Sequence, residues 1–204
     1  MKLEFKILYG LLAVAAVLFF MLAGRPGTGN YVKISEYNPV LGQEDAPVTF
    51  SVFGDYKCSY TKQLFEEVLP QLKESYIDTG KVKLVYKHLV AHEESKIAAE
   101  ASLCAHDQGK FWPFVSIILE NTEEWSQGGN ITFDKYANEL GLDENAFSDC
   151  LDQHSHRIHV EKDYDEGKEL GVSGTPTFFI NGMKIEGLIA LEKFKDVLSK
   201  FTYS

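Results

Sequence analysis

A strand-like run passes directly into a helix-like run in Val48-Thr49-Phe50-Ser51-Val52-Phe53-Gly54-Asp55-Tyr56-Lys57-Cys58-Ser59-Tyr60-Thr61. Its first six residues are mostly β-branched or aromatic, which predicts a buried strand. Downstream, apolar residues recur at helical spacing, at Leu64, Phe65, Val68, Leu69, Leu72 and Tyr76. Cys58 is therefore expected in the first turn of a helix that follows a buried strand.

The position expected for Cys58 favours thiolate chemistry. Unpaired backbone N–H groups and the helix dipole stabilise an anion at a helix N-terminus, and the thiolate is the form of cysteine that attacks disulfides. The dipole contributes only about 0.3–1 kcal/mol at an exposed site. Position alone therefore leaves two interpretations open, an active-site nucleophile and a small apolar filler of the core.

The composition indicates one soluble acidic domain. The chain has 204 residues, of which 45% are hydrophobic, and this is enough for a substantial core. The net charge of −10 argues against nucleic acid as a partner, because phosphate backbones bind basic surfaces.

The first residues have a different character. Residues 7–23 form an uncharged apolar run that is preceded by Lys2 and Lys6 and followed by Arg25. As a helix this run would span about 25 Å, at the short end of a membrane crossing. We interpret residues 1–24 as an uncleaved single-pass transmembrane anchor, with a cleaved signal peptide as the alternative. The distribution of basic residues places the N-terminus in the cytoplasm and the remaining chain outside it.

Strand and helix patterns divide the remaining chain into four segments. A linker and a first short strand, expected at 32–37, make up residues 25–45. Strand, helix and strand follow in residues 46–91, with a kink at Pro70 and a last strand at 82–87. The pattern is helical over residues 92–165, and strands return in residues 166–204. These elements predict an α/β fold in which helices flank a mixed central sheet, with an inserted helical subdomain.

Within the last segment, Asn181-Gly182 predicts a hairpin between strands at 177–180 and 183–186, before a final amphipathic helix. The helix-like run 157–170 is polar and acidic and is expected to be mostly exposed. His154, His156 and His159 do not share one helix face, so they are interpreted as part of a polar surface helix. No metal site is expected there.

A second motif is Gly171-Val172-Ser173-Gly174-Thr175-Pro176-Thr177-Phe178-Phe179-Ile180. Proline cannot donate a hydrogen bond within a sheet, so Pro176 is expected just before the strand. A cis Thr175-Pro176 bond would expose the backbone of Thr175 for pairing with an extended peptide. Only about 5–6% of X–Pro bonds are cis in folded proteins, so the residues alone do not predict one.

Together with residues 53–60 and Gly109-Lys110-Phe111-Trp112, this motif resembles the DsbA-like thiol-disulfide oxidoreductases of the thioredoxin superfamily. The resemblance covers residues 46–200. It implies a thioredoxin fold, split between residues 46–91 and 166–204 by the helical insertion. It also implies that Cys58 is the attacking thiol, that Thr175 and a cis Pro176 line the substrate groove, and that no metal or organic cofactor is required.

The chain departs from this family at Thr61. The family motif is Cys-x-x-Cys, whereas here it reads Cys58-Ser59-Tyr60-Thr61. Thiol-disulfide exchange passes through a mixed disulfide, and Thr61 has no sulfur with which to resolve it. Its hydroxyl and backbone N–H are expected to support the Cys58 thiolate instead, and Ser59 and Tyr60 are expected to tune the exposure of the site.

The chain has three cysteines, so one disulfide and one free thiol form the simplest arrangement. Some members of the family carry a structural disulfide that joins the two helices on which Cys104 and Cys150 are expected, so the resemblance implies a Cys104–Cys150 bond. Such a bond would close a loop of about 47 residues and contribute about 2–4 kcal/mol. Two alternatives are a pair of buried free thiols and a role for one of these cysteines in resolving Cys58.

The resemblance therefore implies thiol-disulfide exchange outside the cytoplasm through the single thiol Cys58. Exported cysteine-containing proteins would be the substrates, and an external thiol or a membrane redox partner would complete the cycle. The alternative is a non-catalytic binding or chaperone-like module that has lost redox cycling. A glutathione-using transferase is a weaker third hypothesis, because no glutathione site is apparent.

Overall fold

The computed structural model describes residues 31–202. Five strands form one mixed sheet in the order β1-β3-β2-β4-β5, in which only β2 and β3 are parallel. The strands are β1 (Val40–Leu41), β2 (Val48–Gly54), β3 (Val82–His88), β4 (Thr177–Ile180) and β5 (Met183–Glu186). The α/β fold with a mixed central sheet is confirmed.

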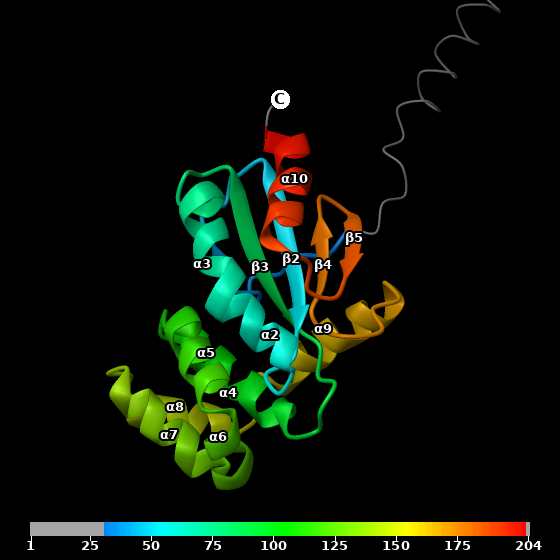
Figure 1. Cartoon of the computed structure of the whole chain (residues 1–204). Coiled ribbons are helices and arrows are strands. Elements are labelled where there is room, and N and C mark those ends of the chain that lie inside the picture. The colour runs from blue at the N-terminus through cyan, green and yellow to red at the C-terminus, as the bar shows by residue number, and fades with distance from the viewer. Residues whose placement is uncertain (1–30, 203–204) are drawn as a thin grey trace, which may run out of the picture.

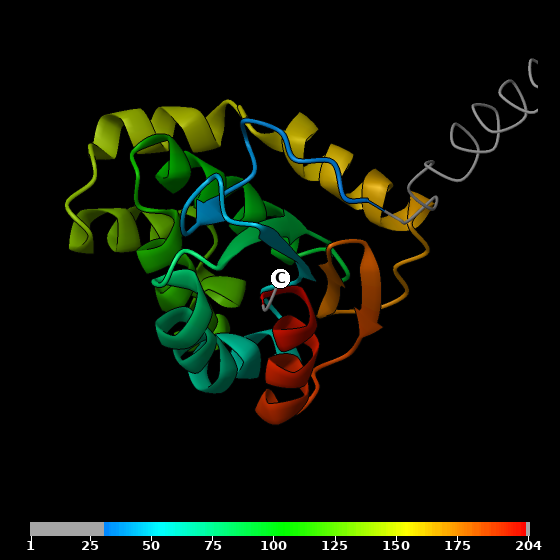
Figure 2. The ribbon, with the colours of Figure 1, turned by 90° about the horizontal axis from the view of Figure 1, so that it is seen from above.

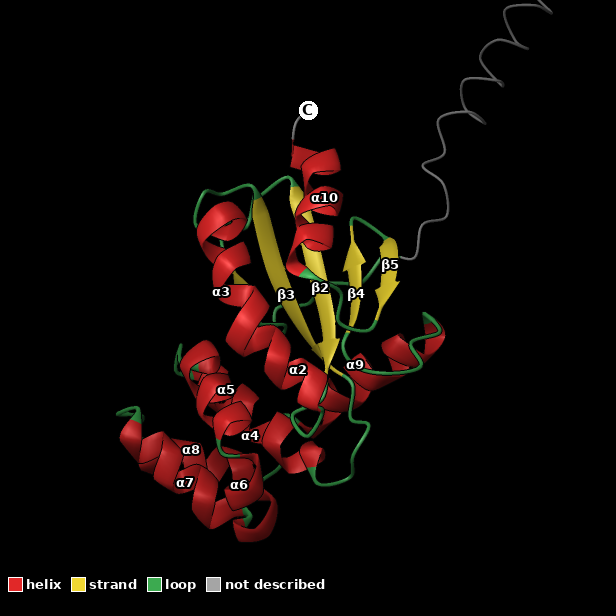
Figure 3. Ribbon diagram, viewed as in Figure 1, coloured by secondary structure: helices red, strands yellow, loops and turns green. Residues whose placement is uncertain are grey.

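Helices cover both faces of this sheet (Figures 1 and 2). The helical stretch after Cys58 and the C-terminal helix α10 (Leu191–Thr202) lie on one face, and α9 (Arg157–Glu169) lies on the other. The insertion stands beside one end of the sheet (Figure 3). It comprises α4 (Ser95–Asp107), α5 (Phe111–Glu120), α6 (Thr122–Gly128), α7 (Asn130–Glu139) and α8 (Glu144–Asp152). The boundary predicted at residue 165 falls within α9.

The helix that follows Cys58 is not uniform. It is divided into α2 (Ser59–Gln63), a π-helical turn η1 (Leu64–Val68), α3 (Leu69–Leu72) and a second π-helical turn η2 (Lys73–Ile77). Pro70 stands at the start of α3 and has no N–H to donate, so regular helical bonding is interrupted at the residue where the kink is predicted.

The predicted hairpin between β4 and β5 is confirmed. Asn181 and Gly182 both have positive φ, at 46° and 87°, as a type I′ turn requires. The Asn181 side chain also ties the hairpin to the central strand, because its Oδ1 accepts a hydrogen bond from the Thr49 N–H at 2.9 Å.

The strand predicted at 32–37 is wrong, since the first strand is β1 at Val40–Leu41. Residues 31–39 instead run alongside α9 (Figure 2). The Tyr37 ring stacks on His159 with 3.5 Å between ring centroids, and the Lys33 N–H donates to the Glu166 carboxylate. Contacts with side chains of α9 therefore hold this segment, and only its last residue bonds to a strand, where the Pro39 carbonyl accepts a hydrogen bond from the Tyr86 N–H at 3.0 Å.

The prediction that residues 157–170 are mostly exposed is also wrong. Val160, Asp163, Glu166 and Gly167 of α9 are buried against the sheet. A Cβ on Gly167 would lie 2.6 Å from Leu89 Cδ1, so this glycine permits the close approach of helix and sheet. The face of α9 that packs on the sheet carries polar residues, and these pair with charged residues of β3. For this reason the sequence of α9 lacks the apolar stripe that usually marks a buried helix face.

His154, His156 and His159 do not form the predicted polar surface helix. His154 precedes α9 in a turn with a φ of 52°, and His156 is buried at 6% exposure. The turn directs His156 inward toward Asp107 at the end of α4.

No helix within residues 31–202 is long and apolar enough to cross a membrane. The predicted anchor, residues 1–24, lies outside the residues that the structure describes.

Candidate active site

Cys58 occupies the N-cap position of α2, directly after the turn that follows β2. Its backbone is extended, with φ −77° and ψ 117°, and its carbonyl accepts a hydrogen bond from the Lys62 N–H at 3.1 Å. Its own N–H donates to the Asp55 carbonyl at 3.2 Å. The parallel strand β2 therefore delivers a half-buried thiol to the positive end of the helix.

The Thr175-Pro176 loop lies next to the Cys58 thiol, although it is far from Cys58 in the sequence. The Thr175-Pro176 peptide bond is cis. The Cys58 thiol donates to the Thr175 carbonyl oxygen across a distance of 3.1 Å, although the two residues are 117 positions apart. Fold topology therefore places the Cys58 thiol beside the backbone segment to which the sequence resemblance assigns substrate binding.

Thr61 is buried beneath the turn, and its hydroxyl accepts a hydrogen bond from the Asp55 N–H at 3.5 Å. Within residues 31–202 the structure shows no hydrogen bond between the Thr61 side chain and Cys58. Ser59 is exposed, and 60% of the Tyr60 surface is exposed. The predicted role of Thr61 in supporting the thiolate stays a prediction, and its observed contact is with the loop.

Asp55 is the residue that sequence reasoning missed. Its buried carboxylate accepts hydrogen bonds from the backbone N–H groups of Lys57, Ala91 and His92, at 2.8, 2.8 and 3.0 Å. It also accepts from the Ser95 hydroxyl at 2.9 Å. Asp55 thus ties the Cys58 turn to the loop before α4. The signal in the sequence was an acidic residue directly after an apolar strand. A carboxylate that is buried at such a position needs hydrogen-bond donors from the surrounding chain.

Two surface hollows lie along the helical stretch that begins after Cys58. One has a volume of about 440 Å³ and lies between the Cys58 turn and the insertion, with Cys58, Lys57, Lys62 and Glu120 in its lining. The other, of about 320 Å³, lies between this helical stretch and the loop before α10, and Cys58 is not part of its lining. The first hollow therefore opens the Cys58 turn to the protein surface.

Gly54 is required where β2 approaches the buried ring of Tyr86. A Cβ at this position would lie 2.5 Å from the Tyr86 hydroxyl oxygen, and Tyr86 is held by stacking on Tyr56 with 5.7 Å between ring centroids. The ring cannot withdraw without disturbing the floor of the active site.

We expect Gly54→Ala to lower the free energy of unfolding by about 1–3 kcal/mol through overpacking. The control is Gly174→Ala, because a Cβ there meets nothing within 4 Å. Urea unfolding of both variants checks this expectation, and equal stabilities would contradict it.

A buried network of charged groups connects β3 to α9 behind the active site. The Lys87 Nζ lies 2.9 Å from Asp163 Oδ1 and 2.9 Å from Glu166 Oε2. Asp163 also accepts a hydrogen bond from the His88 N–H at 3.0 Å, and His88 Nε2 lies 3.1 Å from the Tyr56 hydroxyl. The network therefore positions the strand that carries Tyr86 and the aromatic floor of the site.

Cys104 and Cys150 form a disulfide with Cα atoms 5.9 Å apart, the pairing that the resemblance implies. It joins α4 to α8 within the insertion. The alternative of two buried free thiols is therefore wrong, and Cys58 is the free cysteine of the described residues. Within residues 31–202, three side chains lie close enough together to be potential ligands of one metal ion. They are Cys104, Cys150 and His156, and Cys58 is not among them.

Comparison with known proteins agrees with this geometry. A family model described as Thioredoxin matches residues 35–200. Disulfide bond formation protein D of Bacillus subtilis (strain 168) is 30% identical over 169 residues, which are 79% of this chain and 76% of the relative. The probable disulfide bond formation protein D of Bacillus anthracis is 31% identical over 182 residues, covering 84% and 82% of the two chains.

Solved structures give the same result. Oxidised BdbD from Bacillus subtilis superposes with a TM-score of 0.75 at 28% identity, over 83% of this chain and 95% of that one. Wolbachia pipientis α-DsbA1 has a TM-score of 0.76 at 23% identity, over 86% and 96% of the chains, and supports the fold alone. With Cys58 at a helix start, a cis-proline loop beside it and these relatives, the chain belongs to the thioredoxin family as a DsbA-like thiol-disulfide oxidoreductase.

Proposed function

We propose that this protein exchanges disulfides of exported proteins through Cys58 acting as a single thiol. The observation that carries the proposal is the 3.1 Å contact between Cys58 Sγ and the carbonyl of Thr175, at the residue preceding the cis proline. A substrate strand that pairs with the Thr175 backbone would bring its own disulfide to the attacking sulfur. The helix N-terminus would stabilise the thiolate form.

The reaction has two exchanges. The Cys58 thiolate attacks one sulfur of a substrate disulfide, a bond forms between the two, and the other substrate sulfur leaves as a thiolate that takes a proton from water. A second thiol then attacks the mixed disulfide and Cys58 departs as a thiolate. This second thiol comes from the substrate itself, which gives isomerisation, or from an external thiol or membrane redox partner, which then stays joined to the substrate. A second thiol equivalent of that partner releases the substrate as a dithiol and leaves the partner as a disulfide, which gives net reduction.

Thr61 determines which of these outcomes is available. A dithiol motif stores an oxidising disulfide, whereas Cys58 and Thr61 together have one sulfur. The proposal is therefore monothiol exchange with a long-lived mixed disulfide. We further propose that the domain works outside the cytoplasm, attached to the membrane by residues 1–24.

The test is capture of a peptide that has one cysteine and is supplied as its disulfide-linked dimer, so that the departing thiol leaves on a separate peptide molecule. We expect the folded protein to form a covalent complex with this peptide that accumulates, and that persists once the released peptide thiol is removed. Complex formation should require Cys58 and should be absent in the Cys58→Ser variant. Mass spectrometry under non-reducing conditions measures the complex and identifies the cysteine that carries it.

A matched control is Ser59→Ala, which changes an exposed neighbour and retains the nucleophile. This variant should form the complex at a similar rate. If the folded wild-type protein binds the peptide but no covalent complex appears over a range of pH, a non-catalytic binding module explains the protein better than disulfide exchange does.

A further inference from the structure

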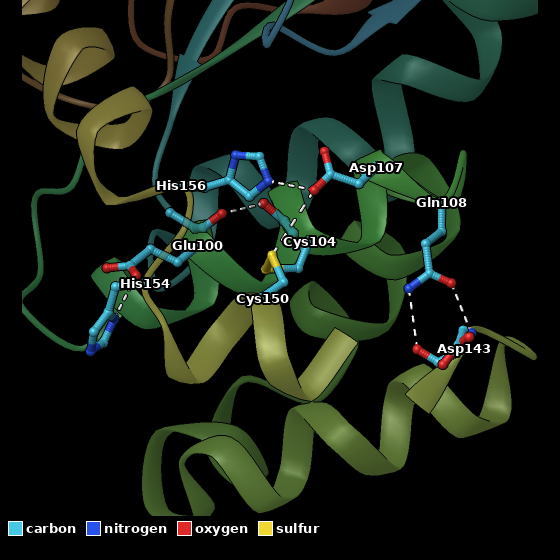
Figure 4. The surroundings of a disulfide bond; sticks show 10 residues. Glu100, Cys104, Asp107, Gln108, Asp143, Cys150, His154 and His156 are labelled. Carbon is cyan, nitrogen blue, oxygen red and sulfur yellow. Dashed lines mark hydrogen bonds and ion pairs between the residues drawn. A yellow bond between two sulfur atoms is a disulfide. The ribbon is translucent and has the colours of Figure 1, made fainter. Parts of the chain in front are cut away.

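The disulfide of the insertion lies within a group of metal-ligating side chains that the exchange reaction does not use. Figure 4 shows Cys104 of α4 bonded to Cys150 of α8, with His156 and Asp107 beside them. We call these four residues the disulfide cluster. The ligand atoms of Cys104, Cys150 and His156 all lie within 4.8 Å of one another. Asp107 Oδ2 lies 2.7 Å from His156 Nε2 and 4.0 Å from Cys150 Sγ.

We propose that the disulfide cluster, once its disulfide is reduced, binds a divalent cation of the Zn²⁺ class. Two thiolates, an imidazole and a carboxylate are the donor types of tetrahedral zinc sites. Zinc–sulfur bonds of about 2.3 Å and zinc–nitrogen bonds of about 2.0–2.1 Å place neighbouring donors roughly 3.3–3.8 Å apart. The donors of the cluster lie within about 1 Å of these separations where the distances are known, at no more than 4.8 Å for the cysteines and His156 and at 2.7 and 4.0 Å for the contacts of Asp107. The two bonded sulfur atoms are the exception, because they must move apart.

The movements needed to close the site are small. After reduction the two sulfur atoms can separate by rotation of the two cysteine side chains. His156 has a ring nitrogen available for the cation, because its Nδ1 is buried without a hydrogen-bond partner among the described residues. Turning the ring gives up the bond to Asp107 and shifts the ring contacts with Tyr37 and His159. Asp107 is free to follow, because 52% of its side chain is exposed.

Reduction controls access to this site. A dithiol reductant attacks the disulfide, most directly at the partly exposed Cys150, and becomes a disulfide itself while Cys104 and Cys150 become thiols. The cation then displaces two protons from these thiols to solvent. The metal would replace the covalent link between α4 and α8, so the insertion would stay folded when its disulfide is lost.

The experiment uses the Cys58→Ser protein, in which Cys104 and Cys150 are the remaining cysteines. The protein is reduced with a phosphine, freed of reductant without oxygen, and titrated with Co²⁺. We expect one equivalent to bind with the charge-transfer absorption of cobalt–thiolate bonds, and Zn²⁺ to displace it. The same protein with its disulfide intact should bind none at this site.

Two matched histidine variants distinguish Co²⁺ binding by the whole disulfide cluster from nonspecific Co²⁺ binding by the two thiols alone. His156→Ala should weaken Co²⁺ binding by at least about tenfold, because loss of a group that only orients a ligand already costs about 10–100-fold in metal affinity. His154→Ala should leave binding unchanged, because His154 turns away and lies 2.7 Å from Glu100 (Figure 4). Circular dichroism of each reduced protein, with and without Zn²⁺, reports whether the metal restores the fold if reduction loosens the insertion.

Three results would overturn the proposal. The first is absence of stoichiometric Co²⁺ binding to the reduced protein. The second is equal binding by the oxidised and reduced forms. The third is an equal effect of His156→Ala and His154→Ala. Disulfide exchange by Cys58 in the wild-type protein is measured separately, so failure here leaves the proposed function unaffected.

Discussion

Replacing Thr61 with cysteine is expected to make the proposed mixed disulfide on Cys58 short-lived, because the new thiol would release the captured peptide. Positions 58 and 61 are neighbours on the first turn of α2, and residues three apart on a helix lie close enough for a disulfide. A sulfur at position 61 would attack the mixed disulfide within the same molecule. Such intramolecular reactions reach effective concentrations far above the millimolar range of an external thiol, so the mixed disulfide should decay at least about a thousandfold faster.

The measurement follows a peptide complex, formed on Cys58, after removal of excess peptide. In Thr61→Cys we expect rapid release of reduced peptide and formation of an internal disulfide. The matched control is Thr61→Ser, which changes the same buried position without adding sulfur and should retain the complex. If Thr61→Cys and Thr61→Ser release peptide at the same slow rate, the side chain at position 61 cannot reach the Cys58 sulfur. The absence of a second cysteine at this position would then not explain a long-lived mixed disulfide.

Replacing Asp163 with alanine is expected to cause a large loss of stability. Lys87 and Asp163 are both buried, with side-chain exposures of 4% and 6%, and their charged atoms lie 2.9 Å apart. Removing one partner of a buried pair leaves the other charge poorly compensated, which costs about 3–5 kcal/mol. Glu166 also contacts Lys87, so we expect the lower end of this range. Urea unfolding at neutral pH measures the change in free energy.

The control is Asp165→Ala on the same helix, where the carboxylate is exposed. Exposed substitutions usually change stability by less than about 0.5 kcal/mol, so the two variants should differ clearly. Equal losses in the free energy of unfolding would show that the buried Asp163 carboxylate contributes no more to stability than the exposed Asp165 carboxylate.

The contribution of Asp163 is expected to depend on pH in a defined direction. Burial alone would raise the pKa of Asp163, but hydrogen bonds from His88 and the charge of Lys87 outweigh it and hold this pKa below its ordinary value of 3.8. A lowered folded-state pKa means that the ionised group stabilises the fold above pH 3.8 and loses this contribution as the pH falls through the folded value. The stability difference between the wild type and Asp163→Ala should therefore shrink in that acidic window. A difference that grows there would contradict this assignment.

Most elements of the fold could be predicted from local patterns. The strand at 48–53, the hairpin at Asn181-Gly182 and the interruption at Pro70 follow from backbone chemistry that does not depend on distant residues. The strand expected at 32–37 failed because an extended apolar pattern does not reveal its partner, and here the partner is a helix. Helix α9 was misjudged because polar residues on its inner face are neutralised by β3, which is far away in sequence.

The candidate site was predictable only in part. Cys58 and Pro176 could be named from their motifs, and the resemblance implied the disulfide between Cys104 and Cys150. Asp55 was overlooked, because a carboxylate followed by a turn looks like solvent-exposed polarity until the loop at Ala91 and His92 is folded onto it.

The amino-acid sequence by itself determined most of the order of strands and helices, the candidate thiol Cys58 and the absence of a second sulfur at position 61, since each depends on side-chain identity and short-range backbone preference. Only the tertiary structure decided that the Cys58 thiol meets the Thr175 carbonyl and that His156 turns inward to Asp107 beside the disulfide. It also decided that Lys87 is neutralised by α9. The physical reason is that these contacts join residues remote in sequence, and their energies appear only when packing removes water between them.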